Sequence, residues 1–294
     1  MTFGTVLRLV AVMALWASCF PLITVGLGFA PHLAFAATRA SLAGVGLFVV
    51  AFLLGRPVPR GAITWLLIAV AGFGTTTLGF IGMFHAAEFV SPGIATIIAN
   101  AQPLLAALLG RIVLDERLNS AGQLGFAVGF AGIVAIAWPG ILSNEMPEFD
   151  LGIGYILLAA TGVASGNVVM KRLTGGVDAA MAMAFQFLIG ALPLVVLSLL
   201  TEDVSAIAWS GEFLAVTAIL ALLVTALPYW LWFATLESTS LNRANAFAFL
   251  TPLIGIGIGA AFFAERLDWI QFIGVGAVLV GVVLVQLDVP KNST

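Results

Sequence analysis

Apolar runs of about 20 residues, separated by short polar and charged clusters, follow one another along the whole chain. A helix of about 20 apolar residues spans the hydrocarbon core of a bilayer. Backbone groups in lipid must bond one another within each span, and the alternating pattern of barrel strands is absent from the sequence. We therefore predict ten transmembrane helices, at residues 5–27, 33–54, 62–84, 92–111, 120–138, 151–171, 179–200, 212–234, 242–263 and 269–287.

The composition is typical of an all-α integral membrane protein without a soluble domain. Hydrophobic residues make up 62% of the 294 residues and charged residues only 9%, whereas soluble domains are roughly a quarter charged. The net charge of −3 offers no basic surface for nucleic acid. With two His and one Cys, we expect no metal site, no cofactor and no disulfide within the chain. The expected partners are a small-molecule substrate and the lipid bilayer.

The first apolar run, residues 5–27, is interpreted as a membrane span and not as a cleaved signal. It is too long for the apolar region of a signal peptide, and it lacks an Ala-x-Ala cleavage site. Within this run we expect Cys19 to be a buried, small apolar residue.

The distribution of Lys and Arg predicts that both termini are cytoplasmic in the inner (plasma) membrane, because cytoplasmic loops carry an excess of these residues. With the N-terminus inside, only Arg266 lies outside and only Arg39 lies well inside a span. The remaining basic residues all fall on the inner side: Arg8, Arg56, Arg60, Arg111, Arg117, Lys171, Arg172, Arg243 and Lys291.

The sequence also repeats itself at an offset of 149 residues, so that residues 71–138 align with 220–287 without gaps. We therefore divide the chain into five-helix repeats at 1–138 and 151–287, joined by the short linker 139–150. Because five is odd, the second repeat must enter the membrane from the opposite side. The aligned pairs include Thr76 with Thr225, Pro103 with Pro252, Gly125 with Gly274, Gly132 with Gly281, and Glu116-Arg117-Leu118 with Glu265-Arg266-Leu267.

Repeats of inverted topology favour a transporter, since two similar halves of opposite orientation can exchange conformations and so alternate access to one site. The alternative is a duplication that only stabilises the bundle. The pairs Gly125-x-x-x-Gly129 and Gly255-x-x-x-Gly259 permit close helix approach. With ten helices available, we assign these glycines to packing within one chain and expect a monomer rather than a dimer.

The chain resembles the EamA-type branch of the drug/metabolite transporter superfamily. The resemblance rests on the two inverted repeats, on Pro103 and Pro252, and on the closing motifs Asp115-Glu116-Arg117-Leu118 and Ala264-Glu265-Arg266-Leu267. It implies export of amino acids, aromatic and other neutral ones in particular. It also implies a central cavity lined by predicted helices 1, 3, 4, 6, 8 and 9, with helices 5 and 10 at the periphery.

Polar residues beside proline mark candidate cavity positions in predicted helices 4 and 9. Asn100 and Gln102 precede Pro103, and Phe249 and Thr251 precede Pro252. Proline frees a backbone carbonyl and bends a helix, so both prolines are predicted hinges. Asn100 could bond the amino or carboxylate group of a substrate. The alternative is a hydrogen bond between helices, worth about 0.6 kcal/mol.

Predicted helices 3 and 8 each carry a hydroxyl followed four residues later by an aromatic residue. These are Thr76 with Phe80 and Thr225 with Tyr229. Such a stripe would suit a substrate with an apolar or aromatic side chain, although ordinary helix packing is the alternative. Further cavity candidates are Trp16 and Ser18 in helix 1, and Ser165 and Asn167 in helix 6.

Arg39 has two interpretations. It could be the partner of a substrate carboxylate, or it could extend along the helix to the lipid headgroups. The second is favoured because Arg39 lies only one and a half turns from the outer end of its predicted span. Every Asp and Glu falls at or beyond a span end, and His32 and His85 fall at the outer edge, so we predict no proton relay.

Three other functions are alternatives to amino-acid export. The first is export of another metabolite or a drug by the same fold, and the second is a solute channel. The third is a membrane enzyme, which would need a nucleophile with its base, or a metal cluster, at depth. The sequence has no His-Glu-x-x-His and no Gly-x-Ser-x-Gly motif, so we predict that the protein is not an enzyme.

Overall fold

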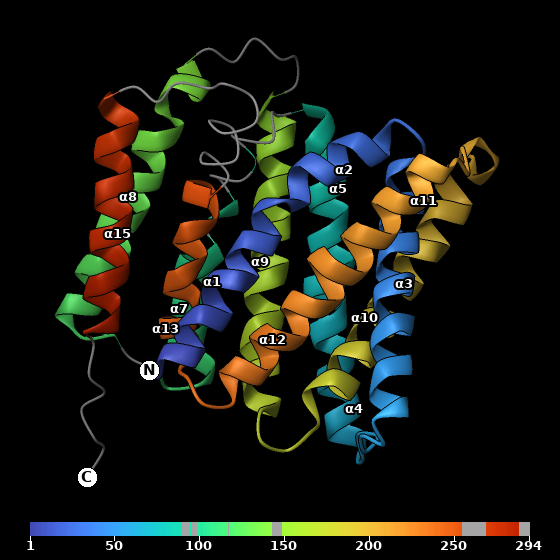
Figure 1. The fold of residues 1–294 in the computed structure, drawn as a ribbon, viewed down its shortest axis with the longest axis horizontal. Helices are drawn as coiled ribbons and strands as arrows, with labels where there is room; N and C mark the ends of the chain where they lie inside the picture. Colours follow the sequence, from blue (N-terminus) through green and yellow to red (C-terminus); the bar gives the residue numbers. More distant parts are fainter. Residues whose placement is uncertain are drawn as a thin grey trace.

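The computed structural model describes residues 1–89, 95, 99–100, 102–116, 118–142, 149–254 and 269–287. Within these ranges the chain forms helices and short turns, and none of the described residues is in a strand. Figure 1 shows the helices side by side in one bundle, with the start of α1 and the end of α15 on the same side. Arg117, the triplet Glu265-Arg266-Leu267 and the pair Gly255 and Gly259, which the sequence singled out, lie outside the described residues.

The helices of the N-terminal half run alternately up and down the bundle (Figure 1). The break between the first two follows from Pro21, which lacks the amide that would bond the carbonyl of Ala17. The elements are α1 (Phe3–Ala17), α2 (Cys19–Leu27), α3 (His32–Leu53), α4 (Ala62–Gly72), the π-helix η1 (Phe73–Leu78), α5 (Gly79–Phe89), α7 (Gln102–Val113) and α8 (Ser120–Leu142).

The C-terminal half continues in the same manner, with short turns between its described helices. Its elements are α9 (Phe149–Leu173), α10 (Ala179–Thr201), the 3₁₀ turn η2 (Val204–Ala206), α11 (Gly211–Ala218), the π-helix η3 (Ile219–Ala226), α12 (Leu227–Leu236), α13 (Leu241–Ala246), the 3₁₀ turn η4 (Phe247–Phe249) and α15 (Trp269–Gln286).

Six described helical segments are long and apolar enough to cross a membrane. They match the predicted spans 1, 2, 3, 6, 7 and 8, and they are Phe3–Leu27, His32–Leu53, Ala62–Phe89, Leu151–Leu173, Ala179–Thr201 and Gly211–Leu236. Shorter apolar helices lie within predicted spans 4, 5 and 10. Predicted span 9 is described only as far as residue 254. An all-α membrane protein is thus confirmed, and the count of ten remains a prediction.

The two π-helical segments occupy corresponding places in the two halves. η1 interrupts the long helix Ala62–Phe89, and η3 interrupts Gly211–Leu236. In η3 the Thr225 hydroxyl donates to the carbonyl of Leu220, five residues back, at 2.6 Å. Single-turn π segments frequently occur at functional sites. Thr76 and Thr225, aligned by the 149-residue offset, lie in η1 and η3 respectively.

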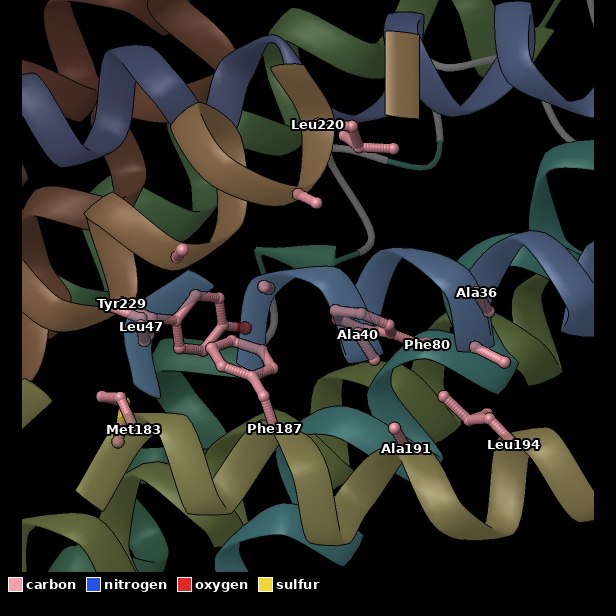
Figure 2. Close-up of a cluster of buried hydrophobic side chains, with 14 of the residues drawn as sticks. Ala36, Ala40, Leu47, Phe80, Met183, Phe187, Ala191, Leu194, Leu220 and Tyr229 are labelled. Atoms are coloured by element: carbon pink, nitrogen blue, oxygen red, sulfur yellow. The ribbon is translucent and has the colours of Figure 1, made fainter. Parts of the chain in front are cut away.

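Helices from both halves share the main apolar core. α3 packs against α10, and Figure 2 shows Ala36 and Ala40 of the first facing Phe187 and Ala191 of the second. Polar bonds add to this contact. The Gln186 amide donates to the hydroxyls of Thr75 and Thr76, and the Thr77 hydroxyl donates to the Gly190 carbonyl at 2.8 Å.

The helices α8 and α15 lie side by side at one edge of the bundle (Figure 1). Glycines bring their backbones together. A Cβ atom added at Gly281 would lie 2.6 Å from the Gly125 carbonyl oxygen, and one at Gly132 would lie 2.7 Å from that of Gly274. The close-approach role predicted for Gly125 is therefore met by a helix of the same chain.

Candidate functional site

A cavity of about 140 Å³ lies within the helix bundle, where helices of both halves meet. Its walls combine one cation, several amides and a group of aromatic rings. Side chains from α1, α2, α3, α5, α7, α9, α12 and η4 line it, together with Ala99 and Asn100 before α7 and Thr251 after η4. The lining residues are Trp16, Cys19, Phe20, Arg39, Met83, Ala99, Asn100, Gln102, Ala159, Ala160, Val163, Asn167, Tyr229, Ala248 and Thr251.

Arg39 is the charged residue of the cavity wall. Its side chain is only 1% exposed, although it lies within the apolar span His32–Leu53. The Nε atom donates to the Thr225 hydroxyl at 2.8 Å, and Nη2 donates to the Cys19 sulfur at 3.2 Å. The guanidinium carbon lies 4.3 Å from the centre of the Phe80 ring, which is favourable for a cation–π contact.

The preferred sequence interpretation of Arg39, extension to the headgroups, is therefore wrong. Arg39 lies seven residues into α3, which is about 10 Å along the helix axis. The neighbouring turns of α3 carry the buried small residues Ala36, Ala40 and Ala43, which leave room beside the helix. The Arg39 side chain points into the bundle because its guanidinium donates to the Thr225 hydroxyl and lies over the Phe80 ring.

No carboxylate pairs with Arg39 among the residues that the structure describes. A buried charge without a partner is costly, so such groups are normally paired or bind a ligand. The Nη1 atom of Arg39 is buried and has no hydrogen-bond partner. The same is true of Trp16 Nε1 and Gln102 Nε2, which belong to the same cavity wall. Residues on three of the helices that line the cavity therefore carry unsatisfied N–H donors.

Aromatic rings make another part of the cavity wall apolar. The Trp16 ring lies 5.3 Å from that of Tyr229 in an edge-on arrangement and 5.4 Å from that of Trp232. Tyr229 in turn packs edge-on against Phe187 at 5.1 Å. Figure 2 shows these last two rings against each other between α12 and α10. Such edge-on pairs hold ring orientations in place, so the wall is a preformed apolar surface.

Several residues that the sequence proposed as substrate-binding reach the cavity, and they come from both halves of the chain. They are Trp16, Arg39, Asn100, Gln102, Asn167, Tyr229 and Thr251. Asn100, Gln102 and Asn167 are buried, at 5%, 9% and 3% exposure. The Thr251 hydroxyl donates to the Met13 sulfur at 3.4 Å.

Other proposed residues lie behind the wall. Phe80 and Thr225 contact Arg39, and Thr76 accepts a hydrogen bond from Gln186. The hydroxyls of Ser18 and Ser165 each bond a carbonyl four residues back in their own helix.

Phe249 and the two prolines also lie away from the cavity lining. Phe249 packs edge-on against Phe126 of α8 at 5.6 Å. Pro103 is the second residue of α7, where a missing amide costs little, and Pro252 is a buried residue of a helical stretch that is described as far as residue 254.

The sequence analysis missed that Cys19 and Phe20 line the cavity, whereas Met83 belongs to the same predicted helix 3 stripe as Thr76 and Phe80. A signal existed for the first two, because they lie three and four residues after Trp16 and so share its helix face. The lining agrees with the one that the family resemblance implied, with Arg39 of the second helix as an addition. Among the described residues, neither α8 nor α15 contributes to it.

The sequence profile of the EamA-like transporter family matches residues 3–138 and 150–287. The chain is 29% identical over 252 residues to a WAT1-related chloroplastic protein of Arabidopsis thaliana, covering 82% of this chain but only 60% of that protein. It is 27% identical to the uncharacterized inner membrane transporter YedA of Escherichia coli strain K12, covering 95% of this chain and 89% of that one.

Two further similarities extend over nearly the whole chain. The probable amino-acid metabolite efflux pump of Escherichia coli strain K12 is 27% identical, with 92% of this chain and 90% of that one covered. A protein of known crystal structure has the same fold, with a TM-score of 0.80 at 19% identity and 97% of this chain covered.

Proposed function

Because the chain belongs to the EamA-like transporter family, we propose that it exports small organic metabolites, foremost amino acids with aromatic or other neutral side chains. The resemblance noted in the sequence is confirmed by this family match. The chain is a multi-pass membrane protein and a transporter rather than an enzyme, as its relatives are named.

The observation that carries the choice of substrate is the composition of the cavity wall. Arg39 offers a cation for a carboxylate, and Trp16 with Tyr229 offers an apolar surface for a side chain. Asn100, Gln102 and Asn167 are placed to bond the polar part of an amino acid. The name of one relative as a probable amino-acid metabolite efflux pump supports the same substrate class.

We propose that the protein works by alternating access between two inverted five-helix repeats, residues 1–138 and 151–287, that together form ten transmembrane helices. Three observations support this arrangement. The family profile matches two consecutive ranges, π-helices occur at aligned places, and aligned glycines contact each other in the reciprocal pairs Gly125–Gly281 and Gly132–Gly274. Pro103 and Pro252 are the proposed hinges. The protein acts as a monomer, with α8 and α15 packed on each other.

The proposed location is the bacterial inner membrane, with both termini in the cytoplasm. The name of YedA as an inner membrane transporter supports the location. The excess of Lys and Arg on one side supports the orientation, and the start of α1 and the end of α15 lie on the same side of the bundle (Figure 1).

We expect transport without a dedicated proton relay. Relays in membrane proteins use Asp, Glu or His chains at depth. The buried polar residues of the described part of the chain include Arg39, amides and hydroxyls but no Asp, Glu or His. Exchange of a neutral amino acid should therefore continue when the pH gradient is collapsed. Loss of transport on collapse of the gradient would show that a relay exists.

Counterflow with purified protein in liposomes tests the proposal. Vesicles loaded with unlabelled phenylalanine should accumulate external labelled phenylalanine transiently, and excess leucine or tyrosine should suppress the signal. A channel would equilibrate the label without an overshoot. If none of the twenty amino acids supported counterflow, the amino-acid assignment would be wrong, while a different metabolite could still be the cargo of this transporter.

A further inference from the structure

The cavity wall is not balanced in charge for a zwitterion. Arg39 supplies a full positive charge, while the described lining residues include no Asp and no Glu. An amino acid would satisfy the guanidinium with its carboxylate. Its ammonium group would meet only neutral amides, hydroxyls and rings, which can accept hydrogen bonds but cannot compensate the charge.

The unsatisfied groups at the wall are also all donors. Arg39 Nη1, Trp16 Nε1 and Gln102 Nε2 are buried without partners, and each requires an acceptor. A carboxylate has two oxygens and several lone pairs, so it is the kind of acceptor that such donors require. An ammonium group donates only and would satisfy none of them.

The position of Arg39 is rigidly defined. Its Nε is bonded to Thr225 and its Nη2 to Cys19, and the Phe80 ring supports the face of the guanidinium. Nη1 is the remaining free end, and Arg39 belongs to the cavity wall. A preformed donor of this kind loses little side-chain entropy when an anion binds, which favours affinity.

The size and lining of the cavity limit the size and polarity of the ligand. Its volume of about 140 Å³ is close to that of an engineered cavity of about 150 Å³ that binds benzene. The aromatic residues of the lining are Trp16, Phe20 and Tyr229. A single ring, or an aliphatic chain of similar size, fits this space.

We propose that the cavity recognises small apolar monocarboxylates, for which the carboxylate is required and the α-ammonium group is dispensable. The inference rests on the proposed function in that the cavity is the transport site. Carboxylic acids with one ring and no amino group should therefore bind at least as tightly as the corresponding amino acids.

Binding to the purified wild-type protein tests this directly, with two probes that share a ring and differ in charge. Phenylacetate carries the carboxylate alone, and 2-phenylethylamine carries the ammonium alone. We expect saturable calorimetric binding of phenylacetate, at least as tight as that of phenylalanine, and at least about tenfold weaker binding of 2-phenylethylamine. Equal binding of the two probes, or binding of phenylalanine without phenylacetate, would overturn the inference.

Variants identify the group responsible. Arg39→Gln should weaken phenylacetate binding at least about tenfold, whereas Arg56→Gln, the same change at a half-exposed arginine outside the cavity, should leave it unchanged. If Arg39→Gln does not fold, Trp16→Phe keeps the ring and removes one free donor, and it should weaken binding several-fold. Unchanged binding in a folded Arg39→Gln protein would refute the assignment.

Binding and counterflow together distinguish a failure of the carboxylate inference from a failure of the proposed export function. Phenylacetate binding that depends on Arg39, together with no counterflow of any amino acid, would reject amino-acid export and keep the carboxylate site. Counterflow of phenylalanine that phenylacetate does not inhibit would keep the export function and reject the carboxylate inference.

Discussion

The contact between α8 and α15 predicts that Gly281→Ala destabilises the protein while Gly276→Ala on the same helix does not. A Cβ atom at Gly281 would lie 2.6 Å from the Gly125 carbonyl oxygen and 2.7 Å from the backbone of Gly129. These are backbone atoms of a helix, so they cannot rotate away as a side chain would. The two helices must move apart, and their contact is lost along its length.

Overpacking of this kind costs about 1–3 kcal/mol. For chains of a few hundred residues, about 1 kcal/mol corresponds to about 2–4 °C in melting temperature. The Gly281→Ala protein should therefore melt roughly 2–12 °C lower than the wild type. At Gly276, by contrast, an added Cβ meets nothing within 4 Å, and the alanine gains up to about 1 kcal/mol in helix propensity.

Melting of the purified proteins in one detergent, followed by loss of the monodisperse peak in size-exclusion chromatography, measures the difference. Both variants make the same chemical change on α15, so expression and detergent effects cancel. Since α15 does not line the cavity, the KM for transport should stay at the wild-type value in both. If Gly281→Ala melted at or above the temperature of Gly276→Ala, the close backbone contact would be refuted.

Three further predictions follow from polar contacts and chain orientation. The Glu116 carboxylate caps the start of α13, where it accepts hydrogen bonds from the backbone amides of Leu241 and Asn242 at 2.9 and 3.1 Å. Glu116→Gln should therefore cost about 0.3–2 kcal/mol of stability, seen as a lower melting temperature. An unchanged melting temperature would argue against this cap. Gln186→Leu removes the bonds to Thr75 and Thr76 and should cost about 1 kcal/mol or less, and a melting temperature lowered by more than 10 °C would contradict that weight. A green fluorescent protein fused at the C-terminus should fluoresce and an alkaline phosphatase fusion should be inactive, with the opposite pair of results reversing the predicted orientation.

Much of the architecture could be predicted because a bilayer imposes a strong pattern on sequence. Apolar runs near 20 residues predict helices, and six of the predicted spans coincide with long apolar helices of the structure. The same argument explains why the candidates Trp16, Asn100, Gln102 and Asn167 reach the cavity, since a polar or amphipathic residue in an apolar run rarely faces lipid.

The sequence by itself thus determined the six long apolar helices, their approximate ends and the family. It did not determine how far each helix is rotated about its axis, because in an apolar run several faces are equally compatible with lipid or protein. Arg39 illustrates this, since its depth was known but its direction depends on Thr225 and Phe80. Phe249 is a second example, because it was predicted to line the cavity but packs against Phe126 instead. Only tertiary packing decides these orientations, since it supplies the distant partners that make one rotation lower in energy than the rest.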